Sequence, residues 1–160
     1  MTDKENKALV VYDSLFGNTK KIAEAITEGL SNQYDSRLMS VKDIKITDIN
    51  SIKLLILGSP THGGRYSEAV KDFFASLQDN SLQGIKAFSF DTSIPAGDKG
   101  WFVRLLIKMF GYAAPRISKE LSKKGAVAGG SETFWVLDRE GPLKDGETER
   151  ARSWSTGIVL

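Results

Sequence analysis

Short hydrophobic runs that do not alternate with polar residues recur along the chain. Four of them are rich in β-branched or aromatic residues, a pattern typical of parallel strands that are buried on both faces. They are Ala8 to Tyr12, Leu54 to Leu57, Ala87 to Phe90, and Ala126 to Ala128 continuing towards Phe134 to Leu137. A more polar run, Ser36 to Val41, predicts a fifth strand at an edge of the sheet.

Between and after these runs, apolar residues recur at helical spacing. The first helix is predicted from about Thr19 to Ser31, with apolar residues on one face and lysines and glutamates on the other. Further helices are predicted at about Ser67 to Leu77, from near Pro115 to before Gly125, and after Gly146. Strand and helix thus alternate five times. This order predicts an α/β fold, a doubly wound parallel sheet with helices on both faces, in a single domain spanning residues 1–160.

Composition narrows the class of protein. With 41% hydrophobic and 26% charged residues, the sequence predicts a folded domain and excludes a disordered or fibrous chain. No apolar stretch approaches the roughly 20 residues that a membrane span needs, and the polar start, Met1 to Lys7, does not resemble a signal peptide. We therefore expect a cytoplasmic protein.

Residue types that are rare or absent exclude several chemistries. The chain has no cysteine and one histidine, His62, so thiol catalysis is excluded and no metal site is predicted. The net charge of +2 is too small to indicate nucleic-acid binding. Basic residues are nevertheless concentrated between Lys99 and Lys124, a segment that contains seven basic residues and one acidic residue, Glu120.

Three polar loops follow strand ends, where open α/β sheets bind their ligands. Asp13 to Thr19 leads straight into a helix, so hydroxyls, a glycine and unpaired N–H groups predict a phosphate site there, with a tight turn capped by Thr19 as the alternative. In Gly58 to Ser67, paired glycines let a flat ligand approach the main chain. Asp91 to Ser93 forms the third loop. Neither a nucleotide P-loop nor a dinucleotide fingerprint occurs.

These loops resemble those of the flavodoxin family. Val10 to Thr19, followed by an Ala/Ile-rich helix, is similar to the loop that binds the FMN phosphate in that family. Gly58 to Arg65 resembles its second flavin loop, Phe90 to Thr92 the start of its third, and Glu140 to Ala151 its closing segment. The resemblance covers nearly the whole chain. It implies a five-stranded parallel sheet in the order 2-1-3-4-5 and a noncovalently bound FMN.

The resemblance also assigns residues to the parts of an FMN site. The residues that would cradle the phosphate are Ser14, Leu15, Phe16, Gly17, Asn18 and Thr19. Those that would run beside the isoalloxazine are Pro60, Thr61, His62, Gly63 and Gly64, and those facing the ribityl chain and ring are Asp91 and Thr92. The Gly63–Gly64 peptide is implied to flip when the flavin is reduced. No catalytic side chain is predicted, because the cofactor carries the reaction.

Three features depart from the family pattern. Phe16 stands where the family usually has Ser or Thr, which predicts weaker phosphate binding. The second loop has no evident stacking aromatic, so His62 and Tyr66 are the candidates; His62 alternatively titrates beside the flavin or is an exposed residue without a role. The pI near 8.8 contrasts with the acidic carriers of the family and points to acidic redox partner proteins.

An insertion from Ile94 to Tyr112 separates the fourth strand from the next helix. It predicts an extra amphipathic helix at about 99–110, whose apolar side chains sweep most of the circumference and leave Arg104 and Lys108 on a narrow stripe. Such a helix is expected to be buried nearly all round. Three interpretations stay open for Trp101–Phe110: a lid over the flavin, self-association or partner contact, or a peripheral contact with an anionic membrane.

The leading hypothesis is an FMN-binding electron carrier that shuttles electrons between a reductase and an acceptor. The alternatives are an FMN-dependent NAD(P)H or quinone reductase with a lid helix, and a flavin-free interaction module on a flavodoxin fold.

Overall fold

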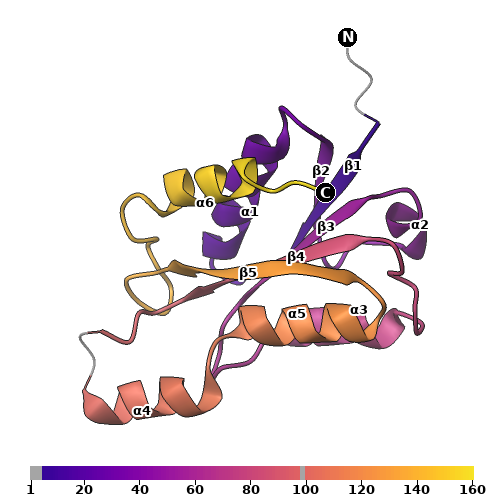
Figure 1. The fold of residues 1–160 in the computed structure, drawn as a ribbon. Helices are drawn as coiled ribbons and strands as arrows, with labels where there is room; N and C mark the ends of the chain where they lie inside the picture. The colour runs from indigo at the N-terminus through magenta and orange to yellow at the C-terminus, as the bar shows by residue number, and fades with distance from the viewer. Residues whose placement is uncertain (1–4, 98–99) are drawn as a thin grey trace.

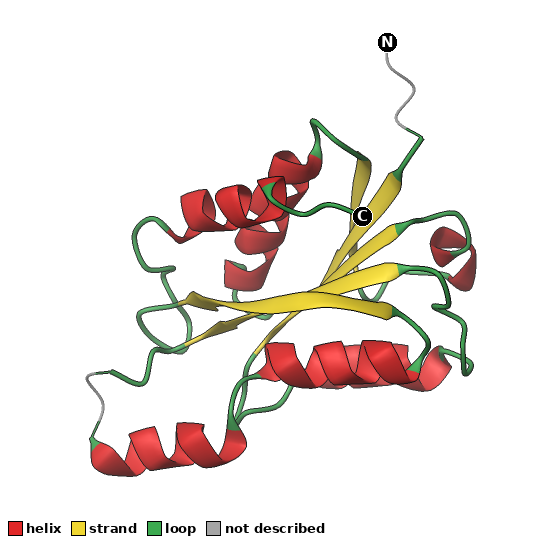
Figure 2. Cartoon of the chain, viewed as in Figure 1, coloured by secondary structure: helices red, strands yellow, loops and turns green. Residues whose placement is uncertain are grey.

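The computed structural model describes residues 5–97 and 100–160 and shows a parallel sheet between two layers of helices (Figure 1, Figure 2). The strands are β1 Lys7–Tyr12, β2 Asp35–Ser40, β3 Leu54–Pro60, β4 Lys86–Ser93 and β5 Val127–Trp135. The helices are α1 Asn18–Leu30, α2 Ile46–Ile49, α3 Glu68–Ser76, α4 Trp101–Phe110, α5 Ala113–Lys123 and α6 Glu147–Thr156.

The sheet has the predicted topology. Its strand order is β2-β1-β3-β4-β5, and every pairing is parallel. The polar strand β2 lies at one edge, as expected, while the apolar strands β1 and β3 lie inside with residues such as Val10 and Ile56 fully buried. Because Tyr12 pairs with Gly58 and Pro60 pairs with Thr92, the carboxyl ends of β1, β3 and β4 meet at one edge of the sheet.

Helices bury apolar faces on both sides of this sheet (Figure 1). α1 and α6 cover one side, where Ile22, Ile26 and Ala151 are buried in the core. α3 and α5 cover the other side, which contains buried Phe74 and Ile117. Each fully buried side chain of this size contributes about 1.5–3 kcal/mol, so the two cores hold the carboxyl edge of the sheet rigidly.

The predicted helices are confirmed with small shifts of their ends, and one helix was not predicted. α2 contains four residues, too few to give a helical pattern of apolar positions. The fifth strand ends at Trp135 rather than at Leu137, and most of its residues are exposed.

The extra helix is confirmed as α4, but its expected all-round burial is wrong. Trp101 is 77% exposed and Met109 is 66% exposed. α4 lies beyond the end of α5, to one side of the sheet (Figure 1), so its outer face meets no other element of the described chain. Within the described residues, every helix is too short or too polar to cross a membrane.

Candidate functional site

The loop from Ser14 to Thr19 turns the chain from β1 into α1 and exposes backbone donors. Gly17 has a left-handed φ of 92°, which glycine adopts without strain. Its N–H donates to Ser14 Oγ at 3.0 Å, and its carbonyl accepts the first helical bond, from Lys21 N at 3.1 Å. The N–H groups of residues 18–20 precede that bond, so the helix leaves them available to an anion.

The side chains of Asn18 and Thr19 hold neighbouring loops in place. Asn18 Nδ2 donates to the Glu140 carbonyl at 3.0 Å. The hydroxyls of Thr19 and Thr92 are hydrogen-bonded to each other at 2.8 Å and are buried. These hydrogen bonds join the first loop to the third loop and to the closing segment, and the predicted role of both residues in holding a phosphate stays a prediction.

The loop after β3 is a tight hairpin turn. His62 and Arg65 exchange two backbone hydrogen bonds of 3.0 Å each, and the residues between them, Gly63 and Gly64, have φ values of 56° and 75°. Two consecutive positive φ values define a type I′ turn, which explains why two glycines stand here. The Thr61 N–H donates to the Thr92 carbonyl at 3.0 Å, so this turn is anchored to the end of β4.

Two adjoining cavities open at this edge of the sheet. The inner cavity has a volume of about 260 Å³. The outer cavity has a volume of about 560 Å³ and lies between the His62–Arg65 turn and α4. The two share Thr61, His62, Gly63, Ser93 and Ile94 in their walls, so they adjoin, and we call the two together the channel.

Most residues predicted for the FMN site line this channel. Those in the inner cavity are Ser14, Leu15, Phe16, Asn18, Thr19, Pro60, Thr61, His62, Gly63 and Thr92, and Gly64 lines the outer cavity. Gly17 and Asp91 line neither cavity. Gly17 acts through the backbone turn that it allows, whereas Asp91 lies beneath the wall.

Asp91 lies behind the residues that line the cavities and holds one of them in place. Its side chain is fully buried, and its Oδ2 accepts hydrogen bonds from Thr61 Oγ1 at 2.5 Å and from Ala114 N at 3.2 Å. Within the described structure its Oδ1 is buried without a hydrogen-bond partner. Burial raises the pKa of Asp91, while the Thr61 hydroxyl and the amides at the start of α5 act against that rise. Asp91 therefore positions Thr61, and its predicted contact with the ribityl chain stays a prediction.

The structure adds wall residues that the loop motifs did not indicate. Arg139 and Val136 reach the inner cavity from the segment after β5, which the bond between Asn18 and Glu140 holds against the first loop. Arg139 brings a positive charge to the end of the channel where α1 begins. The resemblance of the closing segment to the flavodoxin family starts at Glu140, one residue too late to include Arg139.

Of the two candidate stacking residues, His62 lines both cavities and Tyr66 lines neither. Tyr66 packs edge-on against Phe74, with ring centroids 5.6 Å apart. Tyr112 lines the outer cavity and packs against Trp135 at 5.6 Å. Burial raises the pKa of Tyr112, and the nearby Asp91 carboxylate raises it further. Tyr112 is distant from the second loop in sequence, so only the fold brings the two together.

The channel suits a ligand with an anionic end and a flat apolar end. Free backbone donors, the positive end of α1 and Arg139 meet at the inner cavity, where they fit a phosphate. Glycines and the apolar side chains of Ile94, Leu106 and Ile107 surround the outer cavity, where they fit an aromatic ring system. This donor set and shape fit FMN.

Comparison with known proteins agrees with this geometry. A family model described as flavodoxin matches residues 10–154. The chain is 32% identical to a flavodoxin of Maridesulfovibrio salexigens over 162 residues, which cover 96% of this chain and 97% of that protein. It superposes on an archaeal flavodoxin with a TM-score of 0.69 at 20% identity, covering 94% of each chain. For oxidised flavodoxin 2 of Bacillus cereus the TM-score is 0.67 at 21% identity, covering 93% of this chain and 94% of that one.

The chain belongs to the flavodoxin family. Proteins of this family bind FMN and transfer electrons to redox partner proteins, so this chain is an FMN-binding electron-transfer protein.

Proposed function

We propose that the protein shuttles electrons between a reductase and an acceptor protein through FMN bound along the channel. The observation that carries this proposal is that the two cavities adjoin at the carboxyl edge of the sheet and share wall residues. The inner cavity supplies backbone donors and Arg139 for the phosphate, and the outer cavity supplies a wide space for the ring. When bound, FMN accepts electrons from a donor and passes them to an acceptor.

The chain's own residues would bind and orient the cofactor. The N–H groups at the start of α1 would hold the phosphate, and the Thr61–Gly64 segment would hold the ring. Ile94 and Tyr112, which line the outer cavity, would shield the ring from water. The Gly63–Gly64 peptide can rotate between turn types because neither residue has a Cβ, which allows its N–H or its carbonyl to face the flavin.

FMN titration followed by a coupled assay tests this proposal. FMN fluorescence should be quenched stoichiometrically by the purified chain. The loaded protein should then accelerate electron flow from NADPH and a flavodoxin reductase to cytochrome c, while giving little NADPH oxidation alone. Unquenched FMN fluorescence at tens of micromolar, which corresponds to about 6 kcal/mol of binding, would contradict the proposal.

A second function, an FMN-dependent reductase of a small acceptor, is favoured by one observation. The outer cavity has a volume of about 560 Å³ and an apolar wall from Leu106 and Ile107 of α4, which leaves room for a small acceptor beside a flavin ring. A reductase would oxidise NAD(P)H steadily in the presence of a soluble quinone and without any partner protein. A carrier would show that turnover only after a reductase is added.

A further inference from the structure

α4 exposes a stripe of large apolar side chains. Trp101 is 77% exposed, Phe102 58%, Leu105 43% and Met109 66%. In a helix these four residues fall within an arc of about 100°. We call them the apolar stripe. The opposite side of α4 is occupied, since Leu106 and Ile107 are half-buried and line the outer cavity.

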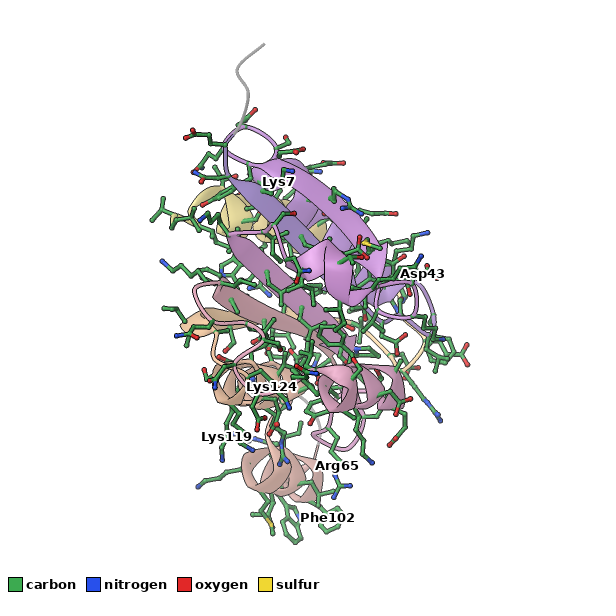
Figure 3. The ribbon with its side chains drawn as sticks, turned by 90° about the vertical axis from the view of Figure 1, so that its right-hand side faces the viewer. Lys7, Asp43, Arg65, Phe102, Lys119 and Lys124 are labelled. Carbon is green, nitrogen blue, oxygen red and sulfur yellow. The ribbon has the colours of Figure 1, made fainter. Side chains whose placement is uncertain are left out.

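The apolar stripe lies at an end of the molecule. α4 stands apart from the sheet and its helical layers (Figure 1), and Phe102 points away from the body of the protein (Figure 3). Scattered exposed apolar residues need no explanation, but four on one face of a single helix mark an interaction surface.

Basic side chains lie along one flank of the apolar stripe and elsewhere at the same end of the molecule. Arg104 and Lys108 are exposed on α4 itself, next to Trp101 and Leu105 around the helix. Arg65 lines the cavity shared with α4, and Lys119 projects from α5; both are exposed and lie at the same end of the molecule as Phe102 (Figure 3). We call these four residues the basic collar. The sequence of α4 contains no acidic residue.

We propose that the apolar stripe and the basic collar dock the protein on a membrane surface that carries anionic phospholipids. Trp and Phe are well suited to the boundary between headgroups and acyl chains, and Lys and Arg attract anionic headgroups. α4 has 10 residues, about 15 Å in length, against a hydrocarbon core of about 30 Å. The helix therefore lies on the membrane and does not cross it.

Charge argues against a second copy of the chain as the occupant. A symmetric dimer through the apolar stripe would bring two basic collars together, and like charges in an interface repel. Anionic lipid provides the opposite charge around an apolar interior, which matches the arrangement of the stripe and the collar.

Docking has a consequence that rests on the proposed function. Because α4 also forms a wall of the outer cavity, a docked protein would hold a bound flavin close to the bilayer. A lipid-soluble electron acceptor would reach it there. The docking itself does not depend on FMN.

Vesicle sedimentation of the FMN-loaded protein tests the proposal. Vesicles of phosphatidylcholine and phosphatidylglycerol in equal parts should sediment most of the protein, and vesicles of phosphatidylcholine alone about tenfold less. Tryptophan emission should shift to shorter wavelength as Trp101 leaves water.

Matched variants separate the two parts of the surface. Trp101→Ser with Phe102→Ser should reduce binding to the anionic vesicles at least about tenfold. Arg104→Gln with Lys108→Gln should reduce both the binding and its sensitivity to salt. The control is Ile46→Ser, which removes a 50% exposed apolar residue from α2 and should bind like the parent protein.

Three outcomes would overturn the proposal. The first is the same sedimentation with and without anionic lipid, and the second is undiminished sedimentation of the Trp101 and Phe102 variant. The third is a dimer in solution that this variant abolishes, which would assign the stripe to a second copy. Quenching of FMN fluorescence by each variant shows whether the variant is folded and binds FMN. A failure of membrane docking can therefore be told apart from a failure of the proposed electron-transfer function.

Discussion

At the scale of single residues, the anion site depends on the backbone conformation at Gly17. A Cβ at this position would meet no atom within 4 Å, so space does not require glycine. The φ of 92° does, because an L side chain in a left-handed conformation costs about 1–2 kcal/mol. The shape of the Ser14–Thr19 loop, which we propose binds the phosphate, thus depends on the glycine at position 17.

We expect Gly17→Ala to weaken FMN binding about tenfold, because the strained turn moves the N–H groups that start α1. Fluorescence titration of the flavin measures the change. The control is Gly97→Ala, at a position with equally open space and no positive φ, which should bind FMN like the parent protein. Equal affinities for the parent and the Gly17 variant would show that the turn tolerates a side chain.

The protonation state of Asp91 affects the stability of the fold. Burial raises its folded pKa above the ordinary value of 3.8. A group with a raised folded pKa contributes stability that is full below its unfolded pKa and is lost as pH rises through the folded pKa. Asp91→Asn keeps an oxygen that can accept from Thr61 and Ala114 but does not ionise. The parent protein should therefore lose stability relative to this variant as the pH rises from below 3.8.

Urea unfolding at a series of pH values measures this difference. Asp13→Asn, a half-buried carboxylate at the end of β1, is the matched control. Parallel stability curves for the parent protein and the Asp91 variant would mean that Asp91 titrates normally. Because Asp91 lines neither cavity, its variant should bind FMN with an affinity within about threefold of the parent.

At the scale of the elements, α1 and α6 pack so closely that only glycine fits between them. A Cβ on Gly29 would lie 2.0 Å from Ser155 Oγ and 2.4 Å from the Arg152 carbonyl oxygen. The second atom belongs to the backbone of α6, so the helix itself would have to move.

Gly29→Ala should lower the free energy of unfolding by about 1–3 kcal/mol, the usual cost of overpacking. Thermal or urea unfolding measures it. Gly157→Ala, where a Cβ would lie 3.6 Å from the Trp154 carbonyl oxygen, is a control with an ordinary contact and should be nearly neutral. A neutral Gly29 variant would show that α6 can shift on α1 without cost.

α6 is also fixed to the end of β5 by charge. Glu147 is buried and accepts hydrogen bonds from Trp135 N and Arg150 Nη2, both at 2.7 Å, while Arg150 stacks 4.5 Å from the centre of the Phe134 ring. Burial by itself would raise the pKa of Glu147, but the hydrogen bonds from Arg150 and Trp135 outweigh it and lower the pKa below 4.5. This pair therefore stabilises the fold above that pH.

Glu147→Gln should lower the free energy of unfolding at pH 7 by about 1–2 kcal/mol, because the charged hydrogen bonds to Arg150 are lost. A lowered folded pKa gives stability that is lost as pH falls below 4.5, so the gap between parent and variant should close in acid. Unfolding curves at neutral and acid pH measure this gap. Asp145→Asn, an exposed carboxylate nearby, should leave it unchanged. A gap that persists in acid would contradict the prediction.

Some elements of the fold could be predicted from the sequence more easily than others. β1, β3 and β4 were evident because strands buried on both faces contain short runs of mostly apolar residues that do not alternate with polar ones. β5 was less evident, since its Gly129, Gly130 and Ser131 are exposed. Gly129 lies against the Phe88 ring, where a Cβ would approach to 2.4 Å. The flavin loops were predicted from local motifs, whereas Arg139 and Tyr112 reach the site only through tertiary contacts that no local pattern encodes.

At the scale of the whole molecule, charge is unevenly placed. The net charge is only +2, yet Arg65 and Lys119 lie toward the end of the molecule that carries α4, while Lys7 lies at the opposite end (Figure 3). A positive end beside the outer cavity would also attract the acidic redox partners that the sequence predicts, in competition with the anionic membrane surface, because opposite charges steer two proteins into productive encounters.

Salt should therefore slow electron transfer between this protein and an acidic reductase. Raising the ionic strength from about 10 mM to about 150 mM shortens the Debye length from about 30 Å to about 8 Å, and the bimolecular rate should fall about tenfold. Stopped-flow reduction of the FMN-loaded protein measures that rate. Arg65→Gln with Lys119→Gln should lower the rate at low salt and flatten its salt dependence, because both charges lie at the end that meets the partner. Lys7→Gln removes a charge from the opposite end and should change neither quantity. A rate that rises with salt would instead indicate that the partner carries positive charge at its contact surface. The basic residues at this end would then not take part in the redox contact.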